Sequence, residues 1–163
     1  MTIDTAGTLA LIPGLPVYRK NSSVVLTAAM RGFCFALWRS AMVPIVITSG
    51  TRTPAAQASA MRTKLDLGED LNALYKQDDL VNEILAGDTS LGGITATLTA
   101  QVNRGRYLSG HMTATAVDIR TQGADAAEMA KLRQAVAALK VKHIFEKVPQ
   151  HLHIEGISSV YAV

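Results

Sequence analysis

Apolar side chains recur at helical spacing in two segments of the chain, about residues 22–41 and 125–140. In the first segment Ser22 or Ser23 can cap the helix, and the second segment is clearly amphipathic. Helices are also predicted at residues 54–64, 71–85 and 94–102. The 54–64 helix follows Thr53, whose residue type suits an N-cap before a proline. The chain therefore contains five predicted helices.

A short β-branched run predicts a strand at residues 44–48, and Val117-Asp118-Ile119 predicts another. Two last strands are predicted after the final helix, at residues 142–148 and 151–157. A tight turn at Pro149 and Gln150 would join the last two strands. Residues 1–20, with a turn cluster at 13–16, are expected to be an extended lead-in, and residues 21–163 a single domain. The order of elements favours an α+β fold with a small, mainly antiparallel sheet flanked by helices.

Composition agrees with one folded domain, because 48% of the 163 residues are hydrophobic and only 18% are charged. The net charge of +3 is scattered and only 5% of residues are aromatic, so no nucleic-acid interface is expected. Cys34 is the only cysteine, which excludes an internal disulfide and a zinc site built on several cysteines.

The longest apolar stretch, residues 24–46, contains Arg31 and Arg39 and is broken by Pro44, so no membrane span is expected. No secretory signal is recognisable either, since Asp4 stands where a positive region would be needed. We therefore expect a protein that is made in the cytoplasm without a signal peptide.

Two short segments near the C-terminus carry most of the candidate chemistry. His151 and His153 alternate with apolar residues and so share one face of the last predicted strand. Asp118 stands between Val117 and Ile119, where its carboxylate needs a partner because an unpaired buried charge is costly. Two histidines and an aspartate from neighbouring strands would form a catalytic zinc site with one open position. His143 is expected to have a structural role.

Three motifs resemble the LAS-type zinc peptidases, which include D-Ala-D-Ala carboxypeptidases and phage endolysins and share the Hedgehog/DD-peptidase fold. The motifs are Ser109-x-His111-x6-Asp118, the C-terminal His151-x-His153, and Ser49-Gly50-Thr51-Arg52-Thr53 with Gln57. The resemblance covers roughly residues 25–157 and keeps the three motifs in the family's order. It implies the same fold and a zinc metallopeptidase.

The resemblance also implies roles for individual residues. His111, Asp118 and His153 would be the Zn²⁺ ligands. Arg52 would act at the edge of the site on a carboxylate or a polarised carbonyl, for which its guanidinium is suited. Ser109 and Gln57 would support substrate binding by hydrogen bonding or by orienting a neighbour.

Two positions depart from the family pattern. Ala114 stands where the family usually has glycine, which matters if that backbone has a positive φ. Gln150 stands where many members have a glutamate that acts as general base, and an amide cannot accept the proton. His151 is therefore the first candidate for the base and Glu155 the second.

The expected substrate is an amide bond in a peptidoglycan stem peptide or crossbridge, cut by a D,D-carboxypeptidase or an endopeptidase. A compact chain without a signal peptide suits a phage endolysin or a virion-associated lysin, delivered by the phage or released at lysis. The alternative, based on Gln150 and Ala114, is an inactive structural or binding protein that retains the metal-site fold.

Overall fold

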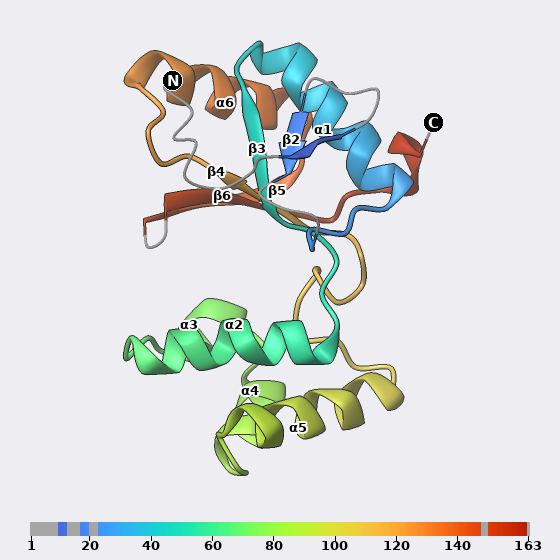
Figure 1. Cartoon of the computed structure of the whole chain (residues 1–163), viewed down its shortest axis with the longest axis vertical. Coiled ribbons are helices and arrows are strands. Elements are labelled where there is room, and N and C mark those ends of the chain that lie inside the picture. Colours follow the sequence, from blue (N-terminus) through green and yellow to red (C-terminus); the bar gives the residue numbers. More distant parts are fainter. Residues whose placement is uncertain (1–9, 13–16, 20–22, 148–149, 163) are drawn as a thin grey trace. The chain divides into compact units, whose positions relative to one another are not determined.

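The computed structural model describes residues 10–12, 17–19, 23–147 and 150–162. The chain divides into two compact units, which we call the sheet unit (residues 1–51 and 114–163) and the helical unit (residues 52–113) (Figure 1). The helical unit is thus inserted in the sequence between two strands of the sheet unit. The prediction of a single domain over residues 21–163 stays a prediction.

Six strands form the sheet within the described residues, in the order β1-β2-β3-β4-β6-β5. Their bounds are β1 Ala10–Leu11, β2 Val17–Arg19, β3 Ile45–Ser49, β4 Val117–Arg120, β5 Lys142–Lys147 and β6 Gln150–Glu155. Only β2 and β3 pair in parallel, and the other neighbours are antiparallel. The predicted α+β class with a mainly antiparallel sheet is confirmed, although β1 and β2 arise from the segment expected to be a lead-in.

One face of the sheet is apolar and packs against two helices, α1 (Ala28–Ala41) and α6 (Ala126–Ala138). Phe33 and Leu37 of α1 and Val136 of α6 share a buried core with Ile119 of β4 and Ile154 of β6. Because side chains alternate along a strand, the residues between these apolar ones point to the opposite face. That face therefore receives the polar side chains of β4, β5 and β6.

The helical unit has its own core. Its helices are α2 Pro54–Asp66, α3 Leu71–Tyr75, α4 Asp78–Leu85 and α5 Leu91–Asn103 (Figure 1). Met61, Leu80, Ile84, Ile94 and Leu98 are fully or almost fully buried among them. No helix in the described part of the chain is long and apolar enough to cross a membrane.

The predicted caps are partly confirmed. The Thr53 hydroxyl accepts a hydrogen bond from Ala56 N at 3.2 Å, with Pro54 at the first helical position, as expected. The first helix was predicted to begin near Ser22 or Ser23, and this is wrong, because Thr27 caps it. The preceding backbone is used elsewhere, since Val25 forms a β-bridge with Thr51.

The predicted helical stretch over residues 71–85 is confirmed in its bounds, but it is divided into two helices. Lys76 ends α3 with φ 52° and Gln77 precedes α4. The predicted 94–102 helix begins earlier, at Leu91, where Ser90 caps it. The expected turns at residues 13–16 and at Pro149 lie outside the described residues.

Ala114, the first residue of the sheet unit after the helical unit, has φ 58°. This left-handed conformation is unfavourable for alanine and is free of that penalty for glycine. We predict that Ala114→Gly raises the free energy of unfolding by about 0.5–1 kcal/mol, as measured by urea denaturation. Ala130→Gly, in the exposed interior of α6, should instead lower it by about 1 kcal/mol. A loss of stability in both variants would contradict a strained Ala114.

Candidate metal centre

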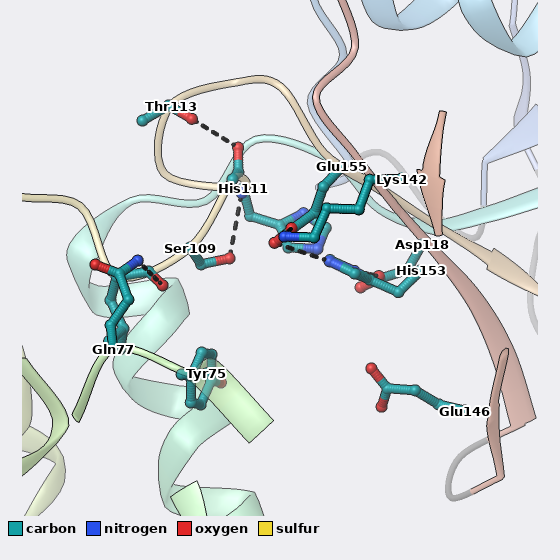
Figure 2. Close-up of polar contacts among 12 residues, drawn as sticks. Tyr75, Gln77, Ser109, His111, Thr113, Asp118, Lys142, Glu146, His153 and Glu155 are labelled. Carbon is teal, nitrogen blue, oxygen red and sulfur yellow. Dashed lines mark hydrogen bonds and ion pairs between the residues drawn. The ribbon is translucent and has the colours of Figure 1, made fainter. Parts of the chain in front are cut away.

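The centre of the polar sheet face is a pair formed by Asp118 of β4 and His153 of β6. The two residues are direct partners in the antiparallel register. His153 Nδ1 lies 2.7 Å from Asp118 Oδ1, and the Asp118 side chain is buried (Figure 2). The buried carboxylate thus has the partner that its position between Val117 and Ile119 required.

Glu155, two residues further along the same face of β6, contacts His153 from its other side. Its Oε1 lies 3.3 Å from His153 Nε2, and its Oε2 forms an ion pair with Lys142 Nζ at 2.7 Å. Burial lowers the pKa of His153, but hydrogen bonds with Asp118 and Glu155 outweigh it and raise that pKa to about 9. The hydrogen bond from His153, together with that from Lys142, lowers the pKa of Glu155 to about 2 despite its partial burial.

His151, the first candidate for the general base, lies on the same face of β6. Its Nε2 is 3.7 Å from Asp118 Oδ1 and 3.6 Å from Glu146 Oε2. Glu146 belongs to β5 and is the cross-strand partner of His151. Sequence reasoning missed Glu146, because only the strand register shows which β5 residue opposes His151.

Gln150 and His143 lie at positions that alternate to the other face. Gln150 is three residues before His153 in β6, so strand geometry directs it away from the Asp118–His153 pair. His143 is the partner of the core residue Ile154, and its Nδ1 lies 2.9 Å from Val141 O. The structural role predicted for His143 agrees with this placement.

His111 lies in a tightly hydrogen-bonded turn of the helical unit and is almost fully buried. Its backbone N–H donates to Ser109 Oγ at 3.2 Å (Figure 2). Met112 N donates to Ser109 O at 2.9 Å. Its carbonyl oxygen accepts a hydrogen bond from Arg52 N at 2.9 Å. Ser109 therefore shapes the turn that carries His111, as a supporting residue would.

Arg52 and Gln57 are also in contact. Arg52 Nη1 donates to Gln57 Oε1 at 3.3 Å, and Gln57 Nε2 donates to Tyr75 Oη at 3.0 Å. Gln57 is fully buried, so this contact restricts the direction of the Arg52 guanidinium. Tyr75 was not identified from the sequence, because no spacing pattern links it to Gln57.

The three predicted ligands are brought together. His111, Asp118 and His153 each offer one ligand atom, and these atoms all lie within 4.8 Å of one another. Two imidazole nitrogens and one carboxylate oxygen are a donor set that zinc accepts, and all three side chains are buried or partly buried. The group can therefore hold a metal ion.

Comparisons with known proteins identified no relative of this chain. No family model matches the chain, and neither a curated protein nor a solved structure matches it. The functional interpretation is therefore argued from the site itself.

We predict that His111→Ala and His153→Ala each abolish stoichiometric zinc binding, because each removes one of three ligands. Equilibrium dialysis followed by elemental analysis measures the zinc retained per chain. His143→Ala is the matched control, since His143 faces the other side of the sheet, and it should retain one zinc. Full zinc retention in His153→Ala would show that the ion binds elsewhere.

Zinc affinity should also depend on pH in a definite direction. With a pKa of about 9, His153 carries a proton at pH 7 in the metal-free protein, and a metal ion must displace that proton. Affinity should therefore rise about tenfold per pH unit from pH 7 to 9 and then level off. A chelator competition assay measures this.

Glu155→Gln is the control for that pH profile. It removes one of the two carboxylates that raise the pKa of His153, so affinity should level off at a lower pH than in the wild type. An affinity that does not change between pH 7 and 9 would contradict a protonated His153.

Proposed function

We propose that the chain is a zinc-dependent peptidase that hydrolyses an amide bond in peptidoglycan peptides. The observation that carries this proposal is the convergence of His111, Asp118 and His153 on a position where they can hold one metal ion. Three protein ligands leave a coordination position open, which is the arrangement of catalytic rather than structural zinc. When bound, zinc supplies an activated water molecule and polarises the scissile carbonyl.

His151 is the residue best suited to accept a proton in this site. It lies on the same face of β6 as His153, and its Nε2 is 3.7 Å from the carboxylate of the ligand Asp118. Glu155 is less suited, because its carboxylate already contacts His153 Nε2 at 3.3 Å and Lys142 Nζ at 2.7 Å. His151 is therefore the preferred general base. Glu155 is proposed to orient His153 through their contact.

Arg52 is proposed to bind the substrate. Gln57 restricts the direction of its guanidinium, and a planar guanidinium suits a peptide carboxylate or the oxyanion that would form at the carbonyl. Ser109 acts indirectly, through the turn of His111. The fold is proposed to be of the Hedgehog/DD-peptidase type, and both a D,D-carboxypeptidase and an endopeptidase fit these roles.

In its biological setting, we propose a phage endolysin or a virion-associated lysin that reaches the cell wall at lysis or with the particle. The three motifs shared with LAS-type peptidases support this proposal. An inactive binding protein would need the same fold without turnover, and the experiment below separates the two.

Purified peptidoglycan provides the substrate for the test. We predict that the zinc-loaded wild type releases new amino groups and truncated or uncrosslinked muropeptides, detected by mass spectrometry, and that chelation abolishes the release. His151→Ala should lower the rate by about 10²–10⁴-fold, as expected for loss of a general base. His143→Ala should remain active.

Two results would overturn parts of the proposal. Wild-type protein that holds one zinc but releases no amine from peptidoglycan would favour the inactive binding protein. Near-normal activity in His151→Ala together with loss of activity in Glu155→Gln would transfer the role of base to Glu155.

A further inference from the structure

The corner between α3 and α4 contains the residues Tyr75, Lys76 and Gln77. Apolar spacing favours a continuous helix here, yet Lys76 has φ 52° and the chain turns. A left-handed lysine is unfavourable, so other contacts must stabilise the corner. Tyr75 and Gln77, on either side of Lys76, make those contacts. Each is connected by hydrogen bonds to a residue of the candidate site or to the segment that precedes one.

Tyr75 is connected to Arg52 by two hydrogen bonds, both of them made by the Gln57 amide. Arginine only donates hydrogen bonds, so the Gln57 amide must present its oxygen to Arg52. The Gln57 NH₂ group, which is buried, then needs an acceptor, and Tyr75 Oη accepts from it at 3.0 Å. Tyr75 thereby supplies the acceptor that Gln57 needs in the orientation that holds Arg52.

Gln77 contacts the backbone of the segment that precedes His111. Its Nε2 donates to Tyr107 O at 3.0 Å and to Leu108 O at 3.1 Å. These carbonyls immediately precede Ser109, whose hydroxyl accepts from His111 N. Figure 2 shows Tyr75 and Gln77 together with Ser109 and His111. The side chain of Gln77 thus fixes the start of the turn that carries a proposed metal ligand.

We propose that the α3–α4 corner is a positioning element with two separate effects, in which Tyr75 orients Arg52 for substrate and Gln77 orients His111 for metal. The Arg52 effect rests on the proposed function, whereas the His111 effect requires only metal binding. The backbone bond from Arg52 N to His111 O joins the two branches. All of these residues belong to the helical unit.

The Tyr75 branch is tested with Tyr75→Phe, which removes only the hydroxyl. In ¹⁵N-correlated spectra the guanidinium signals of Arg52 should broaden or shift, because Gln57 no longer has a fixed orientation. The Arg62 signals are an internal control, since Arg62 is held by Asp66 and Thr89. Zinc affinity should stay within twofold of the wild type, and kcat/KM on muropeptides should fall about tenfold or more. Tyr161→Phe, at a tyrosine of the sheet unit whose ring packs against Phe33, is the matched control and should change none of these.

The Gln77 branch is tested with Gln77→Ala and zinc alone as the probe. Loss of the two bonds from Gln77 to the carbonyls before Ser109 should release the turn that carries His111 and weaken zinc binding about tenfold, while the Arg52 signals stay as in the wild type. Gln134→Ala, on the exposed surface of α6, is the control and should bind zinc normally. Melting temperatures of the metal-free variants establish that each one is folded.

The proposal is supported if Tyr75→Phe changes the Arg52 signals but not the zinc affinity, and Gln77→Ala changes the zinc affinity but not the Arg52 signals. A corner that only stabilised the fold would change the Arg52 signals and the zinc affinity together in each variant. Equal changes in both readouts, unchanged Arg52 signals in Tyr75→Phe, or normal zinc affinity in Gln77→Ala would overturn it. If both expected effects appear but the wild type releases no amine from peptidoglycan, the proposed hydrolysis is wrong and the positioning roles stand.

Discussion

The register between β4 and β6 determines whether a metal centre can exist in this chain. It places Asp118 opposite His153 and leaves Val117 and Ile154 paired on the other face. A slip of either strand by one residue would turn its polar side chain, Asp118 or His153, into the core formed with α1 and α6. The cost of burying a carboxylate or an imidazole there opposes such a slip, so the apolar core and the polar face specify the same register.

Without metal, a protonated His153 stabilises the same polar face, because each of its two N–H groups faces a different carboxylate. His153 lies between the carboxylates of Asp118 and Glu155, and Lys142 balances the second of them. The proton on His153 and a metal ion are therefore alternatives that satisfy the same buried charges. This explains how a face with several ionisable groups is compatible with folding before any metal arrives.

The parts of the site that follow from local alternation could be predicted from the sequence. His151 and His153 share a face because they are two residues apart in a strand, and Thr53 caps α2 through a contact within one turn. The parts that depend on distant contacts could not. Helix α1 begins late because Val25 pairs with Thr51, and Glu146 approaches His151 only through the β5–β6 register.

The corner at Lys76 is the strongest example of such a distant dependence. Its own residues favour a helix through residue 85, but the chain turns at Lys76, and the residues on either side bond to partners far away in sequence: the amide of Gln57 and the carbonyls of Tyr107 and Leu108. An unfavourable local conformation that persists because separate contacts require it is a feature of functional sites. Ala114 has the same character, since its positive φ lies between His111 and Asp118 in the chain. Among the described residues, four that are not glycine have a positive φ: Met42 and Lys140 follow the ends of α1 and α6, whereas Lys76 and Ala114 flank segments that carry candidate ligands or their supports. At these last two positions local propensity and the geometry of a site are expected to conflict.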